Sequence, residues 1–109
     1  MQDKSLFIEF MGDSPTIRVL DYLLTERELD FSITDMAENA GIGRATLYRI
    51  WDNLVKNKII VHTREIGRAK LYRLNTANTK IKKLIEISDM LTLEELKRHS
   101  HKKEIEIAA

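Results

Sequence analysis

The sequence contains no cysteine, one proline and four glycines. Without cysteine the chain forms no disulfide bridge and no thiolate metal site, and a cysteine nucleophile is excluded. No apolar run approaches the roughly 18–20 residues that a membrane-spanning helix needs, and the N-terminus lacks a basic stretch followed by an apolar region. With 43% hydrophobic and 32% charged residues in 109 positions, the composition predicts one globular domain. We therefore expect a single cytoplasmic domain that does not enter a membrane.

Charge is distributed unevenly along the chain, although the formal net charge is only +1. Residues 41–83 contain 11 basic and 2 acidic side chains, whereas residues 1–40 contain 3 basic and 9 acidic ones. Residues 84–109 contain 4 basic and 6 acidic side chains. A basic middle between acidic flanks is expected of a protein that lays one face on a polyanion, although a merely solvated basic face would give the same counts.

Turn residues and apolar spacing together predict a mainly α-helical chain with one small β-hairpin. Ser14 followed by Pro15 has the pattern of an N-cap and first helical position, and Gly67 supplies the turn of the hairpin. The expected helices cover residues 14–25, 32–40, 43–58 and from 78 onward, and the expected strands cover residues 59–64 and 69–74.

These elements divide the chain into four parts. The parts are an N-terminal segment (1–12), an α+β body (13–75), a C-terminal helix or helices (76–98) and a flexible tail (99–109). The apolar residues 5–11 fit a strand and a helical turn equally well. Thr92 and Glu95 have capping-box spacing, so either a separate last helix begins there or the C-terminal helix continues.

The segment from residue 32 to residue 50 has the pattern of two helices joined by a tight turn. Ala37 is small enough for a close helix crossing, and Gly41, four residues later, suits the left-handed conformation of the turn. Leu47, six residues further on, fits the angle between the two helices. Four apolar residues support this arrangement: Met36, Ala40, Ile42 and Ile50. The linked spacing predicts a helix-turn-helix.

With the expected hairpin directly after it, residues 13–85 resemble a winged helix-turn-helix transcriptional regulator of the broad ArsR/MarR-like group, most like its small archaeal members. Gly43–Arg49 resembles the start of the recognition helix, and Glu65–Tyr72 resembles the wing and its returning strand. The resemblance implies an α+β fold with a three-helix core, a wing and a C-terminal helix. It also implies a homodimer on double-stranded DNA, with the 43–58 helix in the major groove. Gly43 stands where Ser or Thr is commoner, which removes one possible hydroxyl contact with a phosphate.

The 43–58 helix carries side chains suited to DNA opposite its apolar face. Arginine can form two hydrogen bonds with guanine, alanine and the threonine methyl can touch thymine, and a tyrosine hydroxyl can reach a phosphate. We predict that this helix contacts DNA through Arg44, Ala45, Thr46, Tyr48, Arg49 and Asn53. We predict that the wing contacts the backbone or minor groove through Arg64, Arg68 and Lys70. Solvated surface charge is the alternative interpretation of these basic residues.

The C-terminal helix has more apolar side chains than a three-helix core with a hairpin can bury. We predict that five of them, together with residues 5–11, form a dimer interface. The five are Ile81, Leu84, Ile85, Ile87 and Leu91. A two-fold dimer would place two recognition helices about 34 Å apart on DNA. The alternative is that this helix packs back on the protomer's own 14–25 helix.

His99, His101 and Glu104 resemble half of the metal site that some ArsR-like sensors carry. The other half would need an acidic residue and a histidine about ten residues upstream, where Ser88–Met90 stands instead. No nucleophile–histidine–carboxylate order, phosphate-binding glycine loop or paired-carboxylate pocket is present either. We therefore predict no metal, no cofactor and no enzymatic activity.

The sequence thus predicts a homodimeric, sequence-specific DNA-binding protein that acts as a transcriptional repressor at the nucleoid. Two alternatives remain: an adaptor that spreads along DNA in partition or chromatin organisation, and a winged helix used for protein–protein contact. The excess of basic residues over positions 41–83 argues against the second. The sequence identifies neither a small-molecule effector nor an operator.

Overall fold

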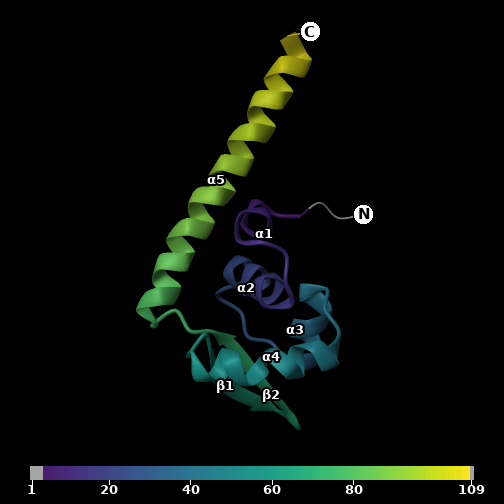
Figure 1. Ribbon diagram of the computed structural model, residues 1–109, viewed down its shortest axis with the longest axis vertical. Helices are drawn as coiled ribbons and strands as arrows, with labels where there is room; N and C mark the ends of the chain where they lie inside the picture. Colours follow the sequence, from purple (N-terminus) through teal and green to yellow (C-terminus); the bar gives the residue numbers. More distant parts are fainter. Residues whose placement is uncertain (1–3, 109) are drawn as a thin grey trace.

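The computed structural model describes the backbone of residues 4–108 and the side chains of residues 4–100. This part of the chain forms five helices and a two-stranded antiparallel hairpin (Figure 1). The elements are α1 (Leu6–Met11), α2 (Pro15–Thr25), α3 (Ile33–Ala40), α4 (Arg44–Lys56), β1 (Ile60–Ile66), β2 (Ala69–Leu74) and α5 (Thr79–Ala108). The predicted α+β architecture, with a three-helix core, a wing and a C-terminal helix, is confirmed.

Serine side chains begin the first three helices. The hydroxyls of Ser5, Ser14 and Ser32 accept hydrogen bonds of 3.1–3.2 Å from backbone N–H groups three residues later. Each bond satisfies a helix N–H that has no partner within the helix. The apolar segment 5–11 is therefore a helix and not a strand. Gly43 precedes α4 without a side-chain cap, as its lack of a hydroxyl requires.

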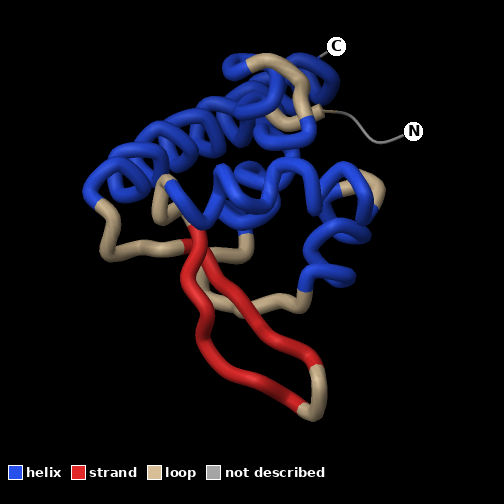
Figure 2. The backbone as a smooth tube through the Cα atoms, turned by 60° about the horizontal axis from the view of Figure 1, so that its bottom comes forward, coloured by secondary structure: helices blue, strands red, loops and turns tan. Residues whose placement is uncertain are grey.

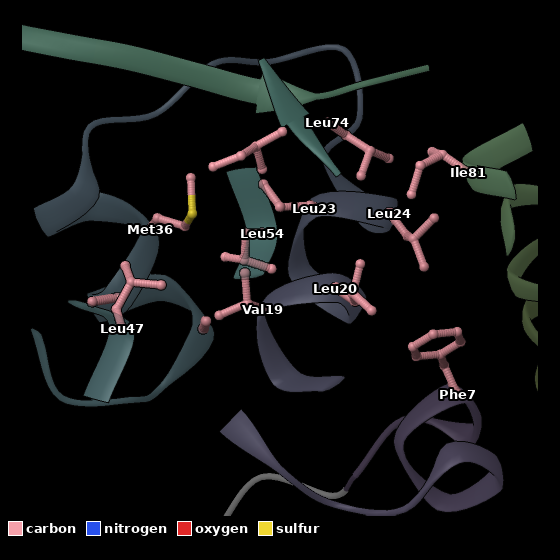
Figure 3. Packing of buried hydrophobic residues seen from close by; sticks show 13 residues of the cluster. Phe7, Val19, Leu20, Leu23, Leu24, Met36, Leu47, Leu54, Leu74 and Ile81 are labelled. Carbon is pink, nitrogen blue, oxygen red and sulfur yellow. The ribbon is translucent and has the colours of Figure 1, made fainter. Parts of the chain in front are cut away.

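The core is built around α2, which contributes Val19, Leu20, Leu23 and Leu24 (Figure 3). Other elements converge on it: Phe7 from α1, Leu47 and Leu54 from α4, Leu74 from β2 and Ile81 from α5. Burying one such leucine, isoleucine or phenylalanine contributes about 1.5–3 kcal/mol. Every helix and the hairpin therefore help to stabilise one cluster.

The turn between α3 and α4 follows the expected helix-turn-helix chemistry. Ala37 is 1% exposed, and Leu47 is fully buried. Gly41 adopts a φ of 72°, a left-handed conformation in which a side chain would be strained. Its N–H donates to the carbonyl of Glu38, and the N–H of Ile42 donates to the carbonyl of Ala37. These bonds end α3 and direct the chain into α4.

The hairpin formed by β1 and β2 projects from the helical body as a wing (Figure 2). Its register pairs Ile60 with Leu74, and an irregularity lies between His62 and Arg64. Phe31, in the loop before α3, exchanges two backbone hydrogen bonds of 2.8 and 2.9 Å with Tyr72 of β2. The base of the wing is thereby tied to the helix-turn-helix.

Helix α5 is continuous from Thr79 to Ala108, so no second helix begins at Thr92 and the helix does not end at the expected boundary after residue 98. It projects beyond the rest of the molecule (Figure 1) and accounts for the elongated dimensions of 56 × 31 × 25 Å. The side chains of His101 and Glu104 lie outside the described residues.

The first turns of α5 complete the core, so several residues expected at a dimer interface pack within the protomer. Ile81 is only 2% exposed and lies in the central cluster, where α5 packs against α2. Leu84, Ile85 and Leu91 are half-buried and pack against the same cluster. Of the five residues expected at a dimer interface, Ile87 alone is exposed.

Candidate nucleic-acid interface

The outer face of α4 presents the side chains that the sequence singles out. Leu47 and Leu54 are buried, and Ile50 and Trp51 pack partly against the core, so the opposite face of the helix is left to solvent. On that face lie the exposed residues Arg44, Ala45, Tyr48, Arg49 and Asn53, with Thr46 half-buried beside them. The structure therefore brings all six predicted residues of this helix to one surface.

Two side chains of this surface are held by neighbours. The Nη2 of Arg49 donates to the hydroxyl of Thr46 at 3.1 Å, which restrains the guanidinium along the helix. The amide oxygen of Asn53 accepts a hydrogen bond of 2.8 Å from the side chain of Asn57. Among the described residues, neither Arg44 nor Arg49 forms an ion pair with a carboxylate. Both guanidinium groups keep donors free for a ligand.

The three predicted contact residues of the wing differ in whether a carboxylate binds them. Arg68 and Lys70 are exposed near the Gly67 turn, and neither pairs with a carboxylate among the described residues. Arg64, in contrast, binds Asp30 through two hydrogen bonds, 2.9 Å from Nε and 3.2 Å from Nη2. Arg64 links the wing to the loop before α3, and its charge is already partnered.

Asp30 also accepts a hydrogen bond of 2.7 Å from the hydroxyl of Thr63, on the strand that carries Arg64. The hydrogen bonds from Arg64 and Thr63 lower the pKa of Asp30 to about 2, because they favour the charged carboxylate. Asp30 is a functional candidate that the sequence did not reveal. Its partner lies 34 residues away, and no local pattern signals such a pairing.

An aromatic contact fixes the wing against α4. The rings of Trp51 and Tyr72 meet edge to face, with centroids 4.8 Å apart, and the ring centroid of His62 lies 5.5 Å from that of Tyr72. Together with Phe31 and the Asp30 ion pair, this contact sets the angle between the wing and α4. Lys56 also lies exposed on the outer face of α4, although it is not among the contact residues predicted from the sequence. Its position seven residues after Arg49, two helical turns, was the available signal.

A pocket of about 380 Å³ is lined by residues of α1, α2, α3 and α5. Asp21, Tyr22 and Glu95 are among its lining residues. Burial raises the pKa of Asp21, and the charge of Glu95 acts in the same direction while a hydrogen bond from Ser5 opposes it. Among the described side chains, no three histidines or carboxylates are placed to hold a metal ion. No helix of the described segment has the length and apolarity to cross a bilayer.

The fold of this chain resembles that of several proteins of known structure. The sequence matches no protein-family model and no curated protein. Among solved structures, the chain is similar to MepR of Staphylococcus aureus, with 21% identity and a TM-score of 0.61 over 93% of this chain and 75% of that one. It is similar to the adhesin competence repressor AdcR of Streptococcus pyogenes, with 20% identity and a TM-score of 0.60 over 94% of this chain and 81% of that one.

A third similar structure is HlyU of Vibrio cholerae, with 18% identity and a TM-score of 0.55 over 77% of this chain and 82% of that one. MepR is a transcription regulator of a multidrug efflux pump. At these identities the likeness establishes the fold alone. The fold is that of winged-helix regulators, in which α3 and α4 form the helix-turn-helix and the β1–β2 hairpin forms the wing.

Proposed function

We propose that this protein binds double-stranded DNA as a homodimer and represses transcription at specific sites. The observation that carries the proposal is the outer face of α4, where Arg44 and Arg49 are exposed and unpaired with carboxylates among the described residues. Arginines on an exposed helix that follows a tight helix-turn-helix can enter the major groove and meet base edges. The transcription regulators of similar fold support this role.

The wing extends the same surface. Figure 1 shows α4 and the hairpin at one end of the molecule, with α5 leading away from them. Arg68 and Lys70 lie near the tip of the hairpin, where a narrow turn can approach phosphates or the minor groove. In this proposal Arg64 keeps the wing in position through Asp30 and is not itself a primary contact.

A dimer is supported by apolar side chains that the protomer leaves uncovered. Met90 is 71% exposed and Phe10 is 67% exposed, and neighbouring side chains of α1 and α5 add to them: Met11, Ile87, Leu93 and Leu96. We call these six residues the α1/α5 apolar surface. Exposed apolar side chains on neighbouring elements are available for a partner to cover. A two-fold dimer would present two copies of α4 to the two halves of a symmetric site.

The decisive experiment is selection of bound duplexes from a random or genomic pool, followed by titration of the selected site at several salt concentrations. We expect enrichment of an inverted repeat. If a dimer engages roughly 6–10 phosphates, affinity should fall about 10³–10⁵-fold between 50 and 200 mM salt. Absence of enrichment together with salt-independent binding would refute the proposal. A footprint that widens steadily with protein concentration would favour an adaptor that spreads along DNA.

A further inference from the structure

A pocket of about 490 Å³ lies where the end of α4, the end of β2 and the start of α5 meet. Three lysines from three segments line it: Lys56 closes α4, Lys58 lies in the turn before β1, and Lys80 lies in the first turn of α5. The other lining residues are Asn57, Asn75, Ala77, Asn78 and Thr79. None of these residues is acidic, and all three lysines are exposed. We call this site the lysine pocket.

Side-chain amides hold the backbone of the lysine pocket in place. The Nδ2 of Asn75 donates to the carbonyl of Lys58 at 2.9 Å, and the Nδ2 of Asn78 donates to the same carbonyl at 3.0 Å. The Oδ1 of Asn78 accepts a hydrogen bond from the N–H of Lys80 at 2.9 Å. Lys58 itself has a φ of 55°, a left-handed conformation that is uncommon for a residue with a side chain. The walls of the pocket are thus fixed by hydrogen bonds within the protein.

The lysine pocket continues the outer face of α4. Lys56 follows Arg49 by seven residues and Asn53 by three, so it lies on the same side of the helix as both. Beyond the end of the helix, Lys58 and Lys80 add two more positive charges beside Lys56. Lys82 and Lys83 are exposed on the following part of α5, and the Nζ of Lys83 lies 3.5 Å from the Oε2 of Glu86.

The pocket is separate from the tip of the wing. It adjoins the base of the hairpin, where β1 begins and β2 ends, whereas Arg68 and Lys70 lie at the opposite end. In Figure 1 the start of α5 lies at the same end of the molecule as α4 and the hairpin. A duplex that met the outer face of α4 would therefore have basic groups beside it both at the wing tip and past the end of the helix.

We propose that the lysine pocket binds backbone phosphates of the duplex contacted by α4, outside the base pairs that α4 reads. This inference rests on the proposed function. Lysine ammonium groups are compact point charges that bind phosphate oxygens without the planar geometry needed to recognise a base. The pocket therefore adds affinity and register and leaves the choice of base sequence to Arg44 and Arg49. A duplex long enough to reach the pocket binds more tightly than one trimmed to the base pairs that α4 contacts.

The test uses the double variant Lys58→Asn/Lys80→Gln, which removes two charges and spares every residue of α4. Asparagine tolerates the left-handed conformation at position 58. The matched control, Lys97→Gln/Arg98→Gln, removes the same charge from exposed positions far along α5. A charge-conserving variant, Lys58→Arg/Lys80→Arg, separates loss of charge from damage to the fold, and thermal unfolding of all three is compared with that of the original protein.

If each pocket of a dimer holds one phosphate, the log–log salt slope should become shallower by about 2 in the double variant, which is about a tenfold smaller loss of affinity between 50 and 200 mM salt. Phosphate-ethylation interference should disappear at positions flanking the site, while base contacts persist. The control and the arginine variant should keep the original slope.

Equal slopes and equal interference patterns in the double variant and the control would overturn the inference and leave DNA binding itself intact. A second test adds inorganic phosphate until the amide resonances of Asn75 and Asn78 show that the pocket is occupied. If the salt dependence of DNA binding were the same with and without this bound phosphate, the inference would also be overturned. Failure of the unmodified protein to bind any duplex would instead refute the proposed function, and the inference with it.

Discussion

Asp30 and Arg64, 34 residues apart in the sequence, form a two-point ion pair in which Nε lies 2.9 Å from Oδ2 and Nη2 lies 3.2 Å from Oδ1. The carboxylate belongs to the loop before α3, and the guanidinium belongs to β1. The wing also contacts the helix-turn-helix through backbone hydrogen bonds between Phe31 and Tyr72 and through the rings of Trp51 and Tyr72, and the ion pair adds a link between charged side chains. Its loss should be measurable both in stability and in DNA binding.

The pH dependence of stability should reveal the Asp30 pair. Its folded-state pKa of about 2 lies below the ordinary value of 3.8, so the pair stabilises the protein above the ordinary value and is lost as the pH falls through 2. We expect Asp30→Asn to lower the free energy of unfolding at neutral pH. Between pH 3.8 and about 2 the variant should lose less stability than the original protein. Urea unfolding at stepped pH measures both effects. Arg64→Gln should act alike, and an unchanged acid limb in both variants would contradict the assignment.

Arginines of α4 and of the wing should differ in what they contribute to binding. Arg44→Ala and Arg49→Ala should each cost about 1–3 kcal/mol on the selected site and less on random duplexes, because we propose that these side chains meet base edges. Arg68→Ala should weaken both kinds of duplex alike, since we propose that the wing contacts phosphates. Anisotropy titrations on both duplexes check this, and equal losses for all three variants would exclude base reading by α4.

The α1/α5 apolar surface should control the oligomeric state. Met90→Glu/Leu93→Glu places charges where a partner would cover exposed side chains, so sedimentation should report a folded monomer of 12.7 kDa. Its DNA affinity should fall sharply, because the two half-sites are no longer bound together. Leu84→Glu/Leu91→Glu should instead unfold the protomer, since both leucines pack against the core. A Met90/Leu93 variant that remains dimeric would place the interface elsewhere.

Asp21 should be a destabilising residue at neutral pH. Burial raises the pKa of its carboxyl and the charge of Glu95 raises it further, so the folded state disfavours the ionised form. Asp21→Asn should raise the unfolding temperature at pH 7, and this gain should vanish below the ordinary value of 3.8, where the carboxyl is protonated in both states. Calorimetry at several pH values tests this. A gain that persisted at low pH would point to packing and not to charge.

Local spacing was sufficient to predict the helix-turn-helix. Ala37, Gly41 and Leu47 act within two adjacent helices, so the distances along the sequence determine how they meet. The segment 5–11 was ambiguous because its seven residues fit either period, and in the structure the hydroxyl of Ser5 caps a helix there. The same helical period identified the outer face of α4. It also places Lys56 on that face, two helical turns after Arg49.

Contacts between distant segments could not be predicted in this way. Periodicity showed that Ile81 shares a face with other apolar residues of the C-terminal helix, but a period does not state what covers that face. In the structure the protomer's own core covers Ile81, and the side chains left exposed include Met90 and Leu93. The partner of Arg64 was hidden for the same reason, since Asp30 belongs to an acidic stretch with no pattern that points to the wing.

The side chain of Asn78 joins the start of α5 to the end of α4. One side-chain amide caps the first turn of α5 through Lys80 and also binds the carbonyls of Asn57 and Lys58 at the end of α4. The 30 residues of α5 extend about 45 Å from this junction. Because Ile81, Leu84 and Leu91 also pack on the protomer's core, the direction in which α5 leaves α4 is set both by the Asn78 hydrogen bonds and by this packing.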